Sequence, residues 1–270
     1  MADVGVVIVT LNAESFLRPL LTGLKSQTIP HEVLIIDSSS TDATHAIANE
    51  FGHKLHVIKR SEFNHGLTRE LGRKLSNKPI VVFLTQDALP ANDRLLENLI
   101  KPLDIAALSY ARQLPYPGAG FFEAFHREYN YPEQSQLRSL QDQSKYGAYT
   151  FFCSDSCAAY RQDKLDLIGG FKDVLLGEDT LACASLLHQG EKIAYAADAQ
   201  VFHSHNYSLS EEFKRSFDIG FARAKLKDLI GGRNSDEKRG RAYAKDLFIR
   251  ILKKPWLIPY TRSEERRVGK

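Results

Sequence analysis

Two aspartates follow directly on patterns that are typical of buried strands. Ile80 to Leu84 is an apolar run without polar alternation, and it leads into a polar triplet that ends at Asp87. His31 to Asp37 is a similar run that ends in a carboxylate. Such runs predict parallel strands covered on both faces, and open α/β sheets bind ligands beyond the carboxyl ends of these strands. Asp87 is equally compatible with a structural role, in which it begins a turn or caps the helix expected from Asn92.

The same sheet edge is expected to gather further polar groups. Glu14 and Arg69 open helices that reach this edge, beside Asp37 and Asp87. Carboxylates accept hydrogen bonds from a pyrimidine N–H or a ribose hydroxyl, and arginine forms paired bonds to phosphate. A divalent cation held by Asp87 and one further ligand would bridge a diphosphate. The pattern therefore predicts a nucleotide diphosphate site. The absence of Gly-x-Gly-x-x-Gly and Walker A motifs argues against dinucleotide oxidoreductases and P-loop enzymes.

Alternating strands and helices must position these residues. Apolar patterns predict strands at 4–10, 31–37, 55–58, 80–84, 105–111, 149–160 and 193–202. Helical spacing separates the first four strands, and further helices are predicted at 161–168, from 177 and from 209. This β-α-β-α order with short connections indicates an α/β fold with a doubly wound, mostly parallel sheet. The aromatic, aperiodic stretch 121–145 predicts a mobile insertion or short helices over the site.

Composition sets outer bounds on function. The chain has 270 residues, 43% of them hydrophobic, and a net charge of +3. Arg262–Lys270 holds four basic and two acidic residues, so the charge is +1 without it, and no nucleic-acid partner is expected. Cys153, Cys157 and Cys183 are too scattered for a disulfide framework, and we expect buried thiols in a reducing cytosol. There is no signal-peptide layout and no apolar run of membrane-spanning length. We therefore expect a cytoplasmic protein, either soluble or peripheral on a membrane.

A series of motifs in fixed order resembles one family. Val-Ile-Val-Thr-Leu-Asn at 7–12, Ile-Ile-Asp-Ser-Ser-Ser-Thr-Asp at 35–42, the strand end at Asp87 and Gly-Glu-Asp at 177–179 are similar to family 2 glycosyltransferases of the GT-A fold. The resemblance covers roughly residues 4–210. It implies a GT-A-like, Rossmann-like sheet flanked by helices, with a helical C-terminal extension.

Three further motifs resemble bacterial rhamnosyltransferases more narrowly. They are Phe-Asn-His-Gly-Leu-Thr-Arg at 63–69, Thr-Gln-Asp at 85–87 and His-Ser-His-Asn-Tyr-Ser at 203–208. The resemblance implies inverting transfer of a sugar from a nucleotide diphosphate, with dTDP-rhamnose as one candidate donor, during synthesis of a bacterial surface polysaccharide. A UDP- or GDP-sugar donor is an alternative. A nucleotidyltransferase would need a glycine-rich basic loop in place of Leu11–Glu14, and a non-catalytic, membrane-associated module is compatible with the reduced metal motif.

The resemblance also assigns roles to individual residues. It places the catalytic base at Asp179, supported by Glu178, and the divalent metal (Mg²⁺ or Mn²⁺) at Asp87. The family's Asp-x-Asp motif is here reduced to that single carboxylate, which His203 or His205 could complete. The resemblance places the contact to the nucleotide base at Asp37 and puts Arg69 near the diphosphate. We expect further nucleotide contacts from Thr10, Asn12, Glu14, Ser39 and Gln86, although Glu14 is equally an ordinary first-turn helix acid.

Each assignment has a structural alternative. From the residues alone, Glu178 and Asp179 are ordinary acids in the first turn of a helix, whose dipole would keep Asp179 ionised at neutral pH. His65 is equally compatible with a supporting role in the site and with a loop cap. A lone histidine such as His203 or His205 is usually structural, although two at one strand end favour a site.

The C-terminal part differs in composition. Lys238 to Lys254 holds seven basic residues and one acid, with apolar residues at helical spacing and Trp256 after them. Such a helix fits either the anionic inner face of a membrane, which would suit a lipid-linked saccharide acceptor, or a solvated helix packed on the domain. We therefore predict a catalytic domain at 1–208, with a nucleotide-binding half (1–104) and an acceptor half (105–208). An extension at 209–260 and a tail at 261–270 follow, and the tail resembles a translated cloning sequence.

Overall fold

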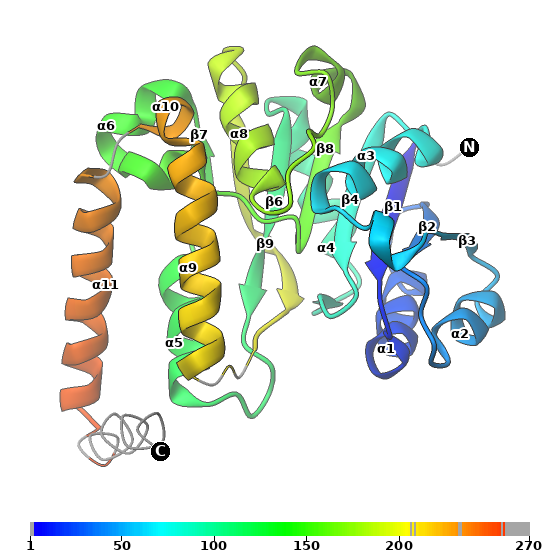
Figure 1. Ribbon diagram of the computed structural model, residues 1–270, viewed down its shortest axis with the longest axis horizontal. Helices are drawn as coiled ribbons and strands as arrows, with labels where there is room; N and C mark the ends of the chain where they lie inside the picture. The colour runs from blue at the N-terminus through cyan, green and yellow to red at the C-terminus, as the bar shows by residue number, and fades with distance from the viewer. Residues whose placement is uncertain (1–2, 206, 208, 232–233, 255, 257–270) are drawn as a thin grey trace. The chain divides into compact units, whose positions relative to one another are not determined.

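A computed structural model describes residues 3–205, 207, 209–231, 234–254 and 256. They fall into two compact units, Met1–Ser204 and His205–Lys270. The predicted tail at 261–270 lies outside the described residues. The first unit holds a mixed sheet with helices beside it (Figure 1), and each unit is described by itself below.

The strands follow the order β3-β2-β1-β4-β8-β6-β9-β5, with β7 paired to β9. Their bounds are β1 (Val4–Thr10), β2 (Glu32–Asp37), β3 (Lys54–Val57), β4 (Ile80–Thr85), β5 (Leu89–Pro90), β6 (Leu108–Leu114), β7 (Gln136–Arg138), β8 (Cys157–Arg161) and β9 (Ile193–Phe202). The β1–β2, β2–β3, β1–β4 and β6–β9 pairs are parallel, whereas β8 runs antiparallel between β4 and β6. The α/β fold with a mostly parallel sheet is as expected, with β8 inserted between parallel strands and β5 and β7 antiparallel to β9.

Helices of the first unit lie between and after these strands. They are α1 (Glu14–Lys25), α2 (Thr44–Glu50), α3 (His65–Ser76), α4 (Leu95–Ile100), α5 (Phe121–Asn130), α6 (Gln143–Tyr146), α7 (Gln162–Leu167) and α8 (Glu178–His188). Short 3₁₀ helices are η1 (Arg60–Glu62), η2 (Lys101–Asp104), η3 (Leu140–Asp142) and η4 (Gly147–Phe151). The second unit contains α9 (Leu209–Lys225), α10 (Lys227–Ile230) and α11 (Asn234–Leu252). In the described part of the chain, no helix is long and apolar enough to cross a membrane.

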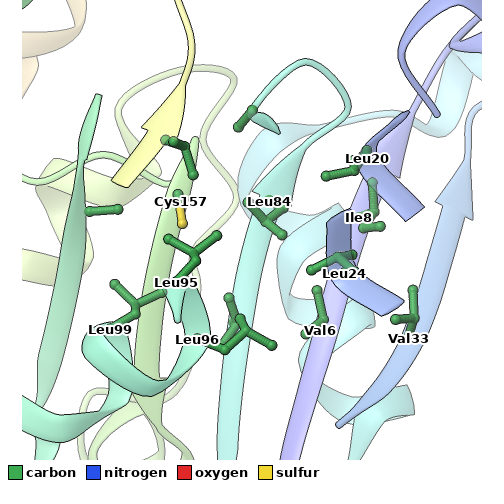
Figure 2. Packing of buried hydrophobic residues seen from close by; sticks show 14 of the residues in the cluster. Val6, Ile8, Leu20, Leu24, Val33, Leu84, Leu95, Leu96, Leu99 and Cys157 are labelled. Atoms are coloured by element: carbon green, nitrogen blue, oxygen red, sulfur yellow. The ribbon is translucent and has the colours of Figure 1, made fainter. Parts of the chain in front are cut away.

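Successive side chains of β1 point to opposite faces of the sheet, and helices cover both faces. Val6 and Ile8 belong to a buried cluster with Leu20 and Leu24 of α1, which Figure 2 shows beside the strand. The intervening Val7 faces α3, where it lies so close to Gly72 that a side chain there would collide with it. Because both faces are buried, the strand is apolar throughout, as the sequence predicted.

One sequence prediction in the second half of the unit is confirmed in one of its alternatives, and another is wrong. The stretch 121–145 holds short helices, α5, η3 and the start of α6, as one alternative expected, together with a strand, β7, that was not predicted and that pairs with β9. The predicted strand at 149–160 starts only at Cys157, because η4 occupies 147–151. The physical reason is Arg138, which is buried and donates hydrogen bonds to the carbonyls of Tyr149 and Phe152. These carbonyls are therefore held by a side chain and not by a neighbouring strand.

Candidate active site

A cavity of about 450 Å³ lies at the carboxyl ends of β1, β2 and β4. It is lined by Val9, Thr10, Leu11, Ser38, Arg60, Phe63, His65, Arg69, Thr85, Gln86 and Asp87. The hydroxyls of Ser38 and Thr85 are buried and find no hydrogen-bond partner within the described chain. Buried hydroxyls normally have partners, so two unsatisfied ones on one cavity wall indicate that a polar ligand completes the site.

Asp37 organises the loop that follows β2. Its carboxylate accepts hydrogen bonds from Thr10 Oγ1 at 2.9 Å, from the amide of Ser40 at 2.8 Å and from His45 Nε2 at 2.7 Å. Burial acts to raise the pKa of Asp37, but these hydrogen bonds outweigh it and hold the pKa below its ordinary value. Thr10 lines the cavity, whereas Asp37 is fully buried beneath it.

Three further residues that were predicted to contact the nucleotide form hydrogen bonds to the same loop, but they do not line the cavity. Asn12 Oδ1 accepts from the amide of Thr41 at 2.9 Å, and Glu14 Oε2 accepts from the amide of Ala43 at 3.0 Å. Ser39 donates its hydroxyl to a carbonyl just after β3 at 2.7 Å. The structure therefore places these side chains beside the pocket wall and not in it.

Gln86 lies in the cavity wall and joins two strand ends. Its Oε1 accepts from the amide of Leu11 at 2.8 Å, and its Nε2 donates to the Leu11 carbonyl at 3.2 Å. This pair of bonds fixes the ends of β1 and β4 side by side. Asp87, the next residue, therefore has a defined position at the cavity edge.

The N-termini of α3 and α8 meet at the other side of the cavity. Asn64 caps α3 by accepting from the amide of Leu67 at 3.0 Å. A side chain at Gly66 would collide with the carbonyl of Lys172, so only glycine lets the 172–174 segment cross the first turn of α3. That segment leads into α8, and the crossing brings Glu178 to α3.

Arg69 joins the carboxylates of this corner. It is only 5% exposed, and its Nε lies 3.1 Å from Asp155 Oδ2 while its Nη1 lies 2.8 Å from Glu178 Oε1. Burial opposes the charged guanidinium, but Glu178 and Asp155 outweigh it and raise the pKa of Arg69. Since Asp179 follows Glu178 directly, one guanidinium is shared by a cluster of Asp155, Glu178 and Asp179, which we call the acid cluster.

The acid cluster changes the expected state of the predicted base. Burial first, and then the adjacent Glu178 carboxylate, raise the pKa of Asp179 to about 6. Burial likewise raises the pKa of Asp155 to about 8, against the lowering effect of Arg69. Burial and the like charge of Glu178 thus act against the stabilising helix dipole, and they leave the pKa of Asp179 below neutral pH. A carboxylate with a pKa near 6 is still mostly ionised at pH 7 and is a stronger base than an ordinary aspartate.

His65 lines the cavity next to Arg69. Arg69 Nη1 lies 3.3 Å from His65 Nδ1, and a guanidinium can only donate, so Nδ1 accepts and the proton sits on Nε2. Burial first, and then the charge of Arg69, lower the pKa of His65 to about 4. His65 is thus a neutral hydrogen-bond donor at the cavity.

Asp87, His203 and His205 form a second polar cluster, which we call the imidazole cluster. One ligand atom from each residue lies within 4.8 Å of the other two. His203 Nε2 is 3.4 Å from Asp87 Oδ1, and its Nδ1 is 2.9 Å from Gln113 Oε1. One carboxylate oxygen and two imidazole nitrogens fit Mn²⁺ better than Mg²⁺, because Mg²⁺ is bound almost wholly through oxygen whereas first-row transition metals also accept imidazole.

Sequence reasoning missed several residues of this region. Asp155 was not among the predicted site residues, although a lone carboxylate in a strand-like stretch is a signal of a buried partner. Phe63 and Arg60 line the cavity, and Phe63 lies within the quoted 63–69 motif. Gln113 carries no sequence signal, because an uncharged side chain in a strand pattern is unremarkable.

A mostly parallel sheet with a cavity at its carboxyl edge and a cluster of metal-ligating side chains is compatible with a glycosyltransferase of the GT-A fold. A family model for "Glycosyl transferase family 2" matches residues 5–169, and the chain belongs to that family. It is therefore an enzyme of sugar transfer.

Two sequence relatives and one solved structure show which glycosyltransferases the chain is similar to. The chain is 39% identical over 225 residues to the O-antigen chain rhamnosyltransferase RfbN of Salmonella typhimurium, covering 80% of this chain and 71% of that protein. It is 41% identical over 196 residues to the O-antigen chain rhamnosyltransferase WbaN of Salmonella anatum, covering 71% of this chain and 62% of that protein. A solved mannosyltransferase, PcManGT from Pyrobaculum calidifontis in complex with GDP-Man and Mn²⁺, shares the fold with a TM-score of 0.64 at 16% identity, covering 99% of this chain and 75% of that one.

Proposed function

We propose that this glycosyltransferase moves rhamnose from dTDP-rhamnose to an acceptor hydroxyl during O-antigen synthesis. The choice of sugar and pathway is carried by the similarity to two O-antigen chain rhamnosyltransferases over most of the chain. The reaction class is supported by the cavity, whose two unsatisfied hydroxyls call for a polar ligand. A UDP- or GDP-sugar is the alternative donor.

The donor would occupy the cavity beneath the loop that Asp37 organises. Thr10 and Ser38 lie where a base or ribose would be bound, and Phe63 offers an aromatic face beside them. Neutral His65 can donate Nε2–H, and Arg69, whose charge is balanced by Asp155 and Glu178, lines the same wall. These N–H donors favour a ligand that is anionic at its diphosphate and neutral at its base.

Asp179 is the proposed general base. The acceptor oxygen forms a bond to the anomeric carbon while the bond from that carbon to the diphosphate oxygen breaks on the opposite face, which inverts the configuration. The acceptor proton passes to the Asp179 carboxylate, and the electron pair of the broken bond leaves with the diphosphate. Glu178 supports the base by holding Arg69 at 2.8 Å.

Asp87, His203 and His205 would hold a divalent metal, for which Mn²⁺ suits the donor set better than Mg²⁺. When bound, such an ion would neutralise negative charge on the leaving diphosphate. These residues are within reach of the nucleotide because Asp87 also lines the cavity.

We also propose that the second unit contacts an anionic membrane surface on the cytoplasmic side, where a lipid-linked saccharide acceptor would be found. Phe213, Phe217 and Phe221 of α9 recur every four residues and are 74%, 66% and 57% exposed. Lys225 Nζ lies 4.6 Å from the ring centroid of Phe221. An aromatic stripe flanked by lysines fits the interface of anionic lipids, where rings enter the headgroup layer and lysines meet its charge.

A thermal-shift and calorimetry screen with dTDP, UDP and GDP, each with and without Mn²⁺, tests the donor. A ligand that binds only the folded state raises the melting temperature. We expect a Mn²⁺-dependent shift with dTDP. A shift confined to UDP or GDP would keep the glycosyltransferase and reject dTDP-rhamnose. No shift with any nucleotide would favour a non-catalytic module.

Vesicle co-sedimentation tests the membrane proposal. The wild type is expected to sediment with vesicles that contain phosphatidylglycerol and not with pure phosphatidylcholine. Exchange of Phe213, Phe217 and Phe221 for serine should abolish this, whereas Leu175→Ser, which alters an equally exposed apolar residue of the first unit (78% exposed), should not. Equal sedimentation of the triple variant would refute the role of the stripe.

A further inference from the structure

Gln113 links the imidazole cluster to α5. It lies on β6, is only 2% exposed, and makes three side-chain contacts. Arg127 Nη1 of α5 reaches Gln113 Oε1 at 2.6 Å, His203 Nδ1 lies 2.9 Å from the same oxygen, and Gln113 Nε2 donates to Ser154 Oγ at 3.0 Å. Both ends of the amide are therefore engaged in the interior of the unit.

The contact with Arg127 fixes which end of the amide is the oxygen. A guanidinium has five N–H donors and no acceptor, so the Gln113 atom that it meets at 2.6 Å must be Oε1. The usual ambiguity of amide orientation is thereby removed. Because Oε1 can only accept, the His203 Nδ1 atom beside it must be the donor. His203 therefore carries a proton on Nδ1, and in its neutral form Nε2 is the unprotonated nitrogen.

This tautomer matters because of what lies on the other side of the ring. A neutral imidazole with Nδ1–H has an unprotonated Nε2, and His203 Nε2 is the atom 3.4 Å from Asp87 Oδ1. Metal-binding histidines need such an unprotonated nitrogen, and the partner of the other nitrogen sets both the tautomer and the orientation of the ring. We propose that Gln113 is a positioning residue that holds His203 in the Nδ1–H tautomer and aims Nε2 at the metal position beside Asp87, an inference that rests on the proposed metal site.

The backbone makes this arrangement rigid. Gln113 pairs with Val201 in the parallel β6–β9 ladder, and the amide of His203 donates to the carbonyl of Leu114 at 2.9 Å. The histidine therefore leaves β9 at a fixed distance from the glutamine of the neighbouring strand. Arg127 adds a positive charge behind Oε1, which keeps that oxygen from rotating away.

The tautomer can be measured directly on the full chain without metal. Long-range ¹H–¹⁵N spectra of the neutral imidazoles report which nitrogen carries the proton, and the His203 signal is identified by its loss in His203→Asn. We expect Nδ1–H in the wild type and in Gln113→Glu, whose carboxylate still accepts from Arg127 and His203. Ser154→Ala should also keep it, because Arg127 still orients the amide. Gln113→Leu should lose it.

Manganese affinity, read by electron paramagnetic resonance of free Mn²⁺, provides the second readout. Loss of an outer-shell partner of a metal-bound histidine typically costs about 10- to 100-fold in affinity. We expect that loss in Gln113→Leu and its rescue in Gln113→Glu, with circular dichroism to compare folding.

The possible results distinguish failure of the proposed role of Gln113 from failure of the proposed metal site. An Nε2–H tautomer in the wild type overturns the role of Gln113 without any variant, so the test survives if Gln113→Leu does not fold. Equal Mn²⁺ affinity in the wild type and a folded Gln113→Leu overturns it as well and leaves the metal site standing. If the wild type shows Nδ1–H but binds no Mn²⁺, the metal proposal fails and the tautomer assignment stands.

Discussion

The acid cluster lies in the first unit, as do Asp87 and His203 of the imidazole cluster, and the two clusters differ in how the charge of their carboxylates is balanced. In the acid cluster, Arg69 supplies a permanent cation, and Asp155 and Glu178 lie within 3.1 Å and 2.8 Å of it. In the imidazole cluster, the groups that meet Asp87 are histidine rings, which are neutral ligands when unprotonated. The counter-ion of the acid cluster is a side chain of the protein, Arg69. The imidazole cluster is suited to bind a metal cation from solution.

From this difference we predict that the acid cluster stabilises the fold and that the imidazole cluster does so far less. The Arg69 guanidinium is part of the chain and is always present in the folded protein. Its removal should therefore lower the free energy of unfolding by a large amount. A cation taken up from solution can be removed without altering the chain, so its loss should affect binding and transfer more than folding.

The largest effect on folding is expected from Arg69→Met. This change leaves Asp155 and Glu178 buried without their cation, and breaking a buried pair in this way costs about 3–5 kcal/mol of unfolding free energy. Urea denaturation would measure it. Arg18→Met is the matched control, because its pair with Glu50 is exposed and should leave the midpoint nearly unchanged. Equal stability of wild type and Arg69→Met would show that the acid cluster does not need its arginine.

Asp179→Asn should abolish transfer and spare binding. Loss of a general base typically costs about 10²- to 10⁴-fold in turnover, while the residues lining the cavity are unchanged. Turnover is measured with the donor that the nucleotide screen identifies, and nucleotide affinity by calorimetry. Asp163→Asn, an exposed aspartate paired with Arg161, is the control. Normal transfer by Asp179→Asn would move the base to another residue of the acid cluster.

Sequence patterns predicted the sheet better than the site. β1 and β9 match their predicted ranges at both ends. β1 is apolar up to its last residue because it is buried on both faces, whereas β9 also carries an exposed Asp198 near its end. η4 and β7 were not predicted, since they depend on the buried Arg138, whose contacts with Tyr149 and Phe152 no local pattern reveals.

The same distinction holds within the site. Asp37 and Asp87 could be placed at one sheet edge because each follows a parallel strand. The pairing of Arg69 with Asp155 could not be predicted, because it joins α3 to the loop before β8, far along the chain. The raised pKa of Asp179 depends on three-dimensional burial, so the first-turn position could predict ionisation at neutral pH but not the upward shift of the pKa.

Asp87→Asn should separate metal dependence from folding. It removes the carboxylate of the imidazole cluster, and since a bound metal contributes several kcal/mol to stabilising developing charge, transfer should fall by about 10²-fold. The melting temperature without metal should stay close to that of the wild type, in contrast to Arg69→Met. Transfer that is unchanged and unaffected by EDTA in both proteins would contradict the metal role.

The smallest expected effect is the pH dependence of wild-type turnover, which reports on the acid cluster without any mutation. Asp179 accepts a proton only when it is ionised, and its pKa is raised to about 6 by burial and then by Glu178. Turnover should therefore be constant above pH 7 and fall about tenfold for each pH unit below 6. An ordinary exposed aspartate would hold the plateau down to about pH 4.

Fluorescence over the same range shows whether the protein stays folded. A plateau that continues to pH 5 in folded protein would mean that Arg69 neutralises the cluster more fully than burial opposes it. The contrast with the imidazole cluster would then lie in the origin of the cation alone.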